Sequence, residues 1–227
     1  MNRGVWIVGT DTDVGKTHIS AQLLRFLSQK IDIVPMKPIQ TGATQGRAPD
    51  LDACLQNAQM IPSSKEYSYM APYLYEPACS PHLAARLSNQ KITIEYIVSC
   101  AQNLWLQHEA LLIEGSGGLL VPINEQQTMF DLVKTIRLPI VLVARGSLGT
   151  INHTLLSLSL LQKADLEIAG VIINDAQGPA SDAFIREDNP ATIASFGNVP
   201  ILADLTFNSS IPESTHELIY DKLFPPV

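Results

Sequence analysis

The stretch GTDTDVGKT, residues 9–17, contains the residue types that bind a phosphate chain. A phosphate-binding loop usually reads glycine, four residues and then Gly-Lys-Ser/Thr, between a strand and a helix. Gly15, Lys16 and Thr17 supply the end of this pattern, but Gly9 lies one residue before the expected position. Free main-chain N–H groups and the helix dipole bind phosphate in such a loop. Lys16 would reach the β- and γ-phosphates, and the Thr17 hydroxyl would bind Mg²⁺.

A second lysine and an acidic residue follow two other apolar runs. Lys37 opens KPIQTG directly after residues 31–36, and Glu114 opens EGSGG after residues 110–113. If both runs are strands of one parallel sheet, these side chains lie at the same edge as Lys16. Two ammonium groups there indicate a highly negative ligand, and a carboxylate at a strand end can hold Mg²⁺. Taken alone, Lys37 would more often be an ordinary solvated lysine, and Glu114 could simply cap a turn.

Three further polar segments could contribute to the same site. PDLDACLQNA begins a predicted helix with Asp50 and Asp52 near its start, where acids commonly do no more than favour the helix dipole. Gly149–Thr150 opens another predicted helix, whose free N–H groups could bind a carboxylate. Asn174–Asp175 ends the run IIND, and its carboxamide could contact a purine edge. Each segment is also compatible with an ordinary turn or helix start.

Six short apolar runs predict the strands that position these residues: 5–8, 31–36, 110–113, 139–144, 168–173 and 199–202. Runs of this length without alternation are typical of strands covered on both faces. Helical spacing of apolar residues, as in Ile19, Leu23 and Leu27, separates several of them. We therefore expect an α/β fold of the P-loop NTPase type, with a mostly parallel central sheet, helices on both faces and a single domain over residues 1–227. Residues 60–82 are expected to be irregular, and the tail from about 204 on is weakly patterned.

Composition narrows the classes of function. The formal net charge is −7 with no basic cluster, which argues against nucleic-acid binding. The three cysteines lie far apart, and the five histidines show no metal-ligand spacing. No apolar run approaches the roughly 20 residues of a membrane span, and the first apolar run is too short for a signal peptide. We expect a cytoplasmic protein that binds neither nucleic acid nor a membrane.

Six segments together resemble the dethiobiotin synthetases, ATP-dependent cyclo-ligases of biotin synthesis. They occur in family order within residues 5 to about 175, and they read GTDTDVGKT, KPIQTG, EPACSPHLAA, EGSGGLLVP, LGTINH and GVIIND. The family carries the same early glycine, which accounts for the position of Gly9. The resemblance implies a homodimer that uses ATP and Mg²⁺ to join CO₂ to 7,8-diaminopelargonate. The implied course is a carbamate, a carbamic-phosphoric anhydride, and ring closure to dethiobiotin with release of ADP and phosphate.

The resemblance also assigns roles by position. It places the nucleotide phosphates on Thr12, Asp13, Val14, Gly15, Lys16 and Thr17. The resemblance implies that the nucleotide site is also lined by Glu114, Gly115, Ser116 and Gly117. The implied catalytic residues are Lys37 and Lys16, and the implied Mg²⁺ ligands are Thr17, Asp50 and Glu114. Adenine contacts are implied for Asn174, Asp175, Pro200, Ile201 and Leu202. The implied substrate contacts are Thr41 and, for the carboxylate across the dimer interface, Gly149, Thr150 and Asn152.

Two positions depart from the family pattern. Ungapped counting through the helix puts the second metal-binding acid at Asp50, whereas Asp52-Ala53 imitates one common local spelling. We place the ligand at Asp50 and keep Asp52 as the alternative. VPILADLTF retains the proline-containing adenine segment around Pro200, but a glutamate sometimes found soon after it has no clear counterpart.

Three other classes of protein share parts of the pattern. ParA/MinD-like partitioning ATPases carry a second lysine five residues before the loop lysine, where this chain has Asp11. Amidotransferases related to cobyrinate synthesis need a glutaminase domain, for which 227 residues leave no room. A non-catalytic nucleotide-binding module is disfavoured by Lys37 and Glu114 beside the phosphate loop, and an assay separates it from an enzyme.

Overall fold

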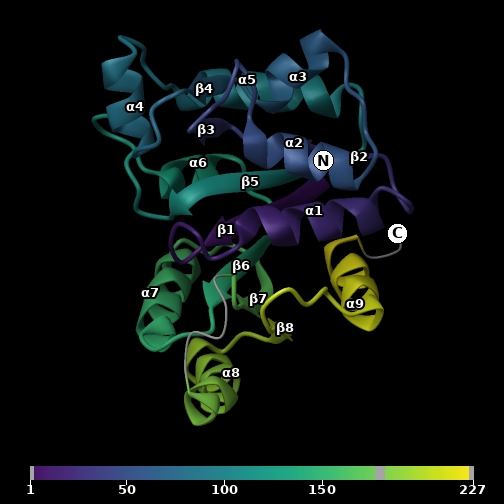
Figure 1. The fold of residues 1–227 in the computed structure, drawn as a ribbon, viewed down its shortest axis with the longest axis vertical. Coiled ribbons are helices and arrows are strands. Elements are labelled where there is room, and N and C mark those ends of the chain that lie inside the picture. The colour runs from purple at the N-terminus through teal and green to yellow at the C-terminus, as the bar shows by residue number, and fades with distance from the viewer. Residues whose placement is uncertain (1–2, 177–181, 225–227) are drawn as a thin grey trace.

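The computed structural model describes residues 3–176 and 182–224, which form a six-stranded sheet with the order β2-β5-β1-β6-β7-β8 (Figure 1). Every pairing in this sheet is parallel. Each predicted apolar run overlaps one strand, and the strands are β1 (Arg3–Gly9), β2 (Ile33–Met36), β5 (Ala110–Gly118), β6 (Ile140–Arg145), β7 (Ile168–Asn174) and β8 (Ile201–Leu205). The predicted fold class is confirmed.

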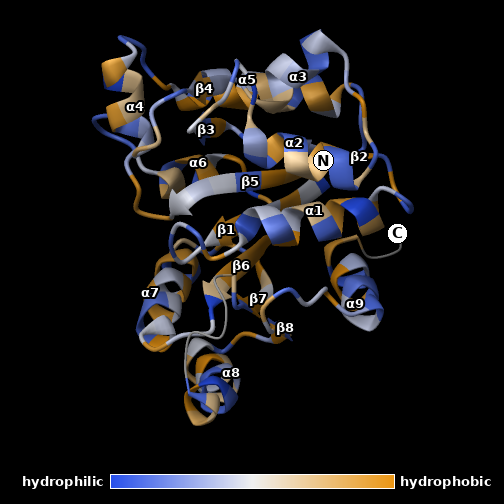
Figure 2. Cartoon of the chain, in the orientation of Figure 1, coloured by the Kyte–Doolittle hydropathy of each residue, from blue (hydrophilic) through white to orange (hydrophobic). Residues whose placement is uncertain are grey.

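Helices cover both faces of the sheet because alternate strand residues point to opposite sides. Val5 and Ile7 of β1 share one buried cluster with residues of α1 (Lys16–Leu27) and α9 (Glu213–Leu223). Trp6 and Val8 belong to the other cluster. That second cluster draws on α5 (Ile94–Trp105), α6 (Met129–Thr135), α7 (Thr150–Lys163) and α8 (Ala183–Gly197). Figure 2 shows β6, in the interior of the sheet, as largely hydrophobic.

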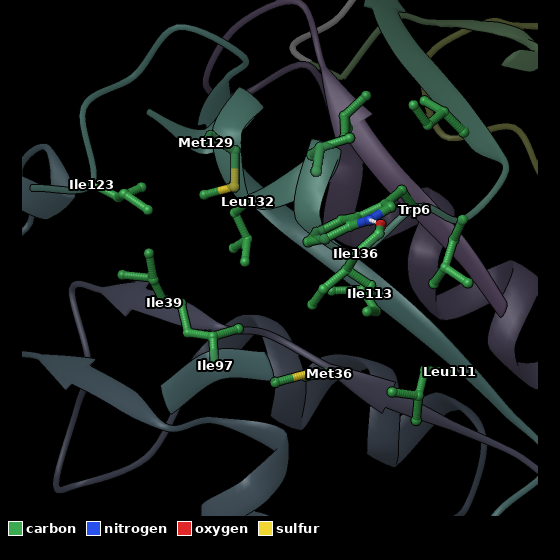
Figure 3. Packing of buried hydrophobic residues seen from close by; sticks show 14 of the residues in the cluster. Trp6, Met36, Ile39, Ile97, Leu111, Ile113, Ile123, Met129, Leu132 and Ile136 are labelled. Atoms are coloured by element: carbon green, nitrogen blue, oxygen red, sulfur yellow. Dashed lines mark hydrogen bonds between the residues drawn. The ribbon is translucent and has the colours of Figure 1, made fainter. Parts of the chain in front are cut away.

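The buried indole of Trp6 fastens α6 to the strand that precedes the phosphate loop. Its ring packs among residues that include Ile113, Met129 and Leu132 (Figure 3). The indole Nε1–H donates to the main-chain oxygen of Ile136, at 2.6 Å. A buried indole needs such a partner, because an unpaired donor is costly away from water. The start of the phosphate loop therefore rests on a rigid base.

A small second sheet lies beside the first and corrects the expectation that residues 60–82 are irregular. β3 (Ile39–Thr41) pairs in parallel with β4 (Tyr73–Tyr75). The same region contains α3 (Ser64–Met70), and its neighbours are α2 (Pro49–Asn57) and α4 (Pro81–Leu87). The sequence carried a signal for α3, because Ser63 and Glu66 form a capping box at its start. The weakly patterned tail forms the end of β8 and α9.

Candidate active site

A cavity of about 930 Å³ opens at the carboxyl ends of β1 and β5 and beside β3. This is the edge of a parallel sheet at which ligands bind. Its lining combines the phosphate loop with residues from five other segments of the chain. The residues expected at a site that line it are Thr12, Asp13, Gly15, Lys16, Thr17, Lys37, Thr41, Asp50, Glu114, Ser116 and Gly117.

The phosphate loop has a backbone that only glycine suits at its last turn. Gly15 caps α1 with φ of 93°, in the left-handed region. A Cβ at this position would lie 2.1 Å from Nδ2 of Asn174. Nδ2 in turn donates to the main-chain oxygen of Val14, at 3.0 Å. Asn174 thus holds the loop from β7, and α1 begins with N–H groups free of a side-chain cap.

Lys37 lies between two carboxylates in the floor of the cavity. Its Nζ donates to Glu114 Oε1 at 2.7 Å and pairs with Asp50 Oδ2 at 2.8 Å. A third bond, of 3.2 Å, reaches the main-chain oxygen of Gly115. The Thr17 hydroxyl donates to the same Glu114 oxygen at 2.9 Å. Glu114 therefore links the phosphate loop to the lysine that follows β2.

The pKa values of the two lysines of the cavity are shifted in opposite directions. Burial, and then the nearby ammonium of Lys37, lowers the pKa of Lys16 from 10.5 to about 8. Nζ of Lys16 donates a hydrogen bond to the main-chain oxygen of Asp11, at 2.8 Å. Burial would also lower the pKa of Lys37, but the carboxylates of Glu114 and Asp50 outweigh it and raise that pKa. Lys16 is thus the cation that gains most from an anionic ligand.

The pKa of Asp50 is lowered by the same ion pair that raises the pKa of Lys37. Burial opposes the ionisation of Asp50, but the ammonium of Lys37, which is paired with this carboxylate, keeps the pKa of Asp50 below its usual value. It is therefore a carboxylate at neutral pH, and it lines the cavity.

The donor set fits a magnesium ion. Oε2 of Glu114 is buried and has no hydrogen-bond partner, so one carboxylate oxygen is free to bind a cation. The Thr17 hydroxyl and the Asp50 carboxylate lie around the same group. Mg²⁺ usually keeps several waters and takes only one or two carboxylates together with substrate phosphates. Consistent with so small a set, no cluster of three or more His, Cys, Asp or Glu suited to a metal occurs in the described part of the chain.

Asp50 and Asp52 lie on different sides of α2. Two residues along a helix correspond to a turn of roughly 200°, so both cannot face one site. Asp50 contacts Lys37, whereas Asp52 accepts two bonds from Arg47, at 2.6 and 2.8 Å. The Tyr67 hydroxyl also donates to Asp52, at 2.9 Å. Of the two candidates, only Asp50 lines the cavity.

The ends of β7 and β8 lie side by side at the same edge of the sheet. Asn174 is level with Leu205, and the N–H of Asp175 donates to the main-chain oxygen of Leu205. The Asp175 carboxylate is buried and paired with Arg186, which also binds Asp204. Neither Asn174 nor Asp175 lines the cavity. Asn174 is hydrogen-bonded to Val14, and Asp175 is paired with Arg186.

Pro200, Ile201 and Leu202, for which adenine contacts are expected, do not line the cavity. Ile201 begins β8 and is level with Val171, three residues before the end of β7. At about 3.3 Å per residue this puts the segment roughly 10 Å from the carboxyl end of β7. Leu202 is also buried in the core. The chain reaches this edge of the sheet only after Leu205, at Thr206, Phe207 and Asn208.

The three residues expected to bind a substrate carboxylate lie outside this cavity. Gly149 caps α7 with φ of 90°, and no side chain caps that helix. Thr150 is fully buried and shares a 3.4 Å hydroxyl contact with Thr154. Asn152 is exposed on the first turn of α7. A ligand in the cavity of the same chain does not touch them.

Several lining residues were not expected from the sequence. The largest group comes from the segment EPACSPH before α4, which contributes to the family resemblance but received no assigned role. It supplies Ala78, Cys79, Ser80 and Pro81, and other segments supply His18, Gln40, Val121 and Ala176. The signal that could have found the first group is the pairing of β3 with β4, which brings this segment over Thr41. Three-residue strands are too short to predict from pattern alone.

The three cysteines form no disulfide, and of them Cys79 lines the cavity. Among the described residues, no helix has the length and apolar character needed to cross a membrane.

Comparison with known proteins identifies relatives along almost the whole chain. A family model described as "AAA domain" matches residues 3–215. The ATP-dependent dethiobiotin synthetase BioD of Lysinibacillus sphaericus is 34% identical over 230 residues, which cover 96% of this chain and 95% of that protein. The protein of the same name from Halalkalibacterium halodurans is 37% identical, with coverage of 92% and 86%. A third, from Paramagnetospirillum magneticum, is 40% identical, with coverage of 89% and 87%.

Solved structures share the fold at low sequence identity. A ParA family ATPase from Chlorobium tepidum has a TM-score of 0.55 and 15% identity, covering 98% of this chain and 91% of its own. The MinC:MinD complex of Aquifex aeolicus gives 0.56 and 11%, with coverage of 97% and 86%. At such identities the likeness establishes the fold alone.

Proposed function

Because the chain belongs to the family of ATP-dependent dethiobiotin synthetases, we propose that it uses ATP to convert 7,8-diaminopelargonate and CO₂ into dethiobiotin, a step of biotin biosynthesis. The observation that carries the proposal is one cavity that contains Lys16, Lys37, Thr17, Asp50 and Glu114. Its two ammonium groups suit a triphosphate and a carbamate, which are both anionic.

The proposed reaction has three steps. One amine of the substrate adds to CO₂ and loses a proton, which gives a carbamate. A carbamate oxygen attacks the γ-phosphorus of ATP, the bond to the bridging oxygen breaks, and ADP leaves. The second amine attacks the carbonyl carbon of the resulting carbamic-phosphoric anhydride, and phosphate leaves as the cyclic urea closes. The chemistry needs positioning and charge stabilisation more than a covalent catalyst.

The chain's own groups supply those needs. The free N–H groups at the start of α1 bind the phosphates, and Lys16 neutralises charge on the β- and γ-phosphates. Lys37 stabilises the carbamate and its phosphorylated form, and Thr41 contacts the substrate from β3. Thr17, Asp50 and Glu114 would hold Mg²⁺, which would neutralise charge on the phosphates. Asn174 and the segment Thr206–Asn208 lie toward the base.

We also propose a homodimer in which α7 of one copy serves the cavity of the other. Gly149, Thr150 and Asn152 do not line the cavity of their own chain, so a substrate carboxylate would reach them only from a second copy. Leu156, on the same helix, is 63% exposed and offers apolar surface for the contact. Light scattering should therefore give twice the mass of one chain, and Asn152→Ala should raise the KM for the diamine more than it changes kcat. A monodisperse monomer with full activity would contradict this arrangement.

The test of the activity is direct. Purified protein given ATP, Mg²⁺, bicarbonate and 7,8-diaminopelargonate should yield dethiobiotin, detected by mass spectrometry, and one phosphate per product. Omission of the diamine or the bicarbonate should stop phosphate release. Equal ATP turnover without the diamine would instead favour a switch ATPase of the ParA/MinD type. Asp11 stands where those proteins carry their second lysine, which already disfavours that alternative.

A further inference from the structure

Asp50 projects from the first turn of α2, and the start of this helix is held by contacts among Arg47, Asp52 and Tyr67, the last of which comes from α3. The segment between β3 and α2 runs from Gly42 to Ala48, and four of its residues, from Thr44 to Arg47, are exposed. A two-residue turn joins Thr44 and Arg47, whose main chains exchange bonds of 3.1 and 3.0 Å. A Cβ added at Gly46 would meet no atom within 4 Å. Little packing therefore fixes this segment.

Arg47, Asp52 and Tyr67 form a clamp at this point. Both Arg47 bonds to Asp52 come from adjacent guanidinium nitrogens, Nε and Nη2, so the pair is bidentate. The guanidinium also lies over the Tyr67 ring, 4.4 Å from its centroid. The Tyr67 hydroxyl completes the set, because it donates to Asp52 Oδ1 at 2.9 Å and accepts from the N–H of Ala48 at 2.8 Å.

The second tyrosine contact has a specific consequence for α2. Ala48 is the residue before the helix, it is fully buried, and it has no side chain that could cap the turn. Its N–H is one of the donors that a helix start leaves without a partner inside the helix. Tyr67, from α3, supplies that partner. One hydroxyl thus fixes both the main chain before Asp50 and the carboxylate two residues after it.

We propose that the clamp of Arg47, Asp52 and Tyr67 is a positioning device that orients the first turn of α2 so that Asp50 faces the Mg²⁺ site. Asp52 lies on the far side of the helix from Asp50, so a bond that holds it sets the rotation of that turn. The inference rests on the proposed function, since it takes Asp50 as a metal ligand.

Tyr67→Phe tests the device with the smallest change, and Tyr73→Phe is its matched control. The Tyr73 hydroxyl accepts from the N–H of Thr93 at 3.0 Å, the same kind of bond at the start of α5. Mn²⁺ is titrated by electron paramagnetic resonance into each protein with a non-hydrolysable ATP analogue. Tyr67→Phe should weaken Mn²⁺ binding about three- to tenfold and raise the KM for Mg²⁺ similarly, while kcat at saturating Mg²⁺ changes little. Tyr73→Phe should leave both constants as in the wild type, although both variants lose thermal stability.

A second pair of variants separates positioning from general damage. Asp52→Asn keeps an oxygen that accepts the Tyr67 hydroxyl, whereas Asp52→Ala does not, so the asparagine should retain more Mn²⁺ affinity. The inference would be overturned if Tyr67→Phe bound Mn²⁺ as tightly as the wild type, or if Tyr73→Phe lost as much affinity as Tyr67→Phe. If Asp50→Asn abolished Mn²⁺ binding in the same experiment, the proposed metal role of Asp50 would still stand. If Asp50→Asn bound Mn²⁺ normally, the metal role of Asp50 would itself be wrong, and the inference would fail with it.

Discussion

Replacing Lys16 by methionine should stabilise the nucleotide-free protein near neutral pH, although it removes a residue expected to bind phosphate. The pKa of Lys16 falls from 10.5 to about 8 in the folded chain, which corresponds to roughly 3 kcal/mol against folding while the group is charged. The variant loses the bond to the Asp11 main-chain oxygen, at about 1 kcal/mol. We therefore expect a net gain of about 2 kcal/mol in the free energy of unfolding.

The sign of the pH dependence follows from proton binding. The unfolded chain holds the Lys16 proton more tightly than the folded chain, so the cost is fully present below about 8. It disappears as the pH rises toward 10.5, the value of the unfolded state. Urea unfolding of both proteins across this range, without nucleotide or Mg²⁺, should show the advantage of Lys16→Met shrinking with pH.

Lys37→Met provides the matched control in the same cavity. Its removal leaves the buried Glu114 carboxylate without its cation, so the free energy of unfolding should fall by about 3–5 kcal/mol. The raised pKa of Lys37 keeps its own contribution constant below 10.5. Lys37 also helps to lower the pKa of Lys16, so below about 8 its removal relieves part of the Lys16 cost, and the loss should be somewhat smaller there than near pH 10.5. If Lys16→Met were no more stable than the wild type near neutrality, or if the two curves failed to converge at high pH, the account of the Lys16 charge would be refuted.

Three other changes test the site. Asp50→Asn should lower dethiobiotin synthesis at least tenfold at limiting Mg²⁺, measured in a product assay. Asp52→Asn should retain most of the synthesis at saturating Mg²⁺. If Asp52→Asn lost more activity than Asp50→Asn, the roles of the two residues would be exchanged. Gly15→Ala should abolish nucleotide binding, measured by calorimetry, because a Cβ there would lie 2.1 Å from the carboxamide nitrogen that ends β7; normal affinity would contradict the loop geometry. Arg186→Met should lower the free energy of unfolding by about 3–5 kcal/mol, measured in urea, since it strips the partner from the buried Asp175. An unchanged midpoint would show that solvent compensates that carboxylate.

The main sheet and the phosphate loop could be predicted because their signals are local. Val5 to Val8 form a continuous apolar run, and a strand buried on both faces needs no more than that. Gly15, Lys16 and Thr17 follow at the spacing of a strand-loop-helix unit. Neither signal depends on a residue far along the chain.

The arrangement of charges in the cavity could not be predicted, because it depends on distant contacts. Lys37 and Glu114 are 77 positions apart, and nothing local states that they form a direct pair. Counting along the sequence favoured Asp50 over Asp52 but did not show what keeps the two apart, which is the hold of Arg47 and Tyr67 on Asp52.

The end of the last strand is another feature that the sequence pattern does not give. The apolar run VPIL ends at Leu202, whereas β8 continues through Ala203 and Asp204 to Leu205. Because ligands lie at the carboxyl ends of parallel strands, the extra three residues move the ligand-binding edge of β8 to Thr206.

The buried charge of Lys16 lowers the stability of the free protein, whereas the charge of Lys37 does not. Selection for binding an anionic ligand would retain the cost at Lys16. Lys37 has three acceptors inside the protein, so its charge is compensated before any substrate arrives. Lys16 has one main-chain acceptor, and burial lowers its pKa to about 8. A triphosphate would remove that penalty on binding, so part of the energy lost in the free protein returns as affinity. Lys37 already occupies one oxygen of Glu114, and the other oxygen of that carboxylate has no partner. If Glu114 holds Mg²⁺ as proposed, the metal and the Lys37 ammonium would draw on the same carboxylate, and metal binding would be coupled to the charge of Lys37.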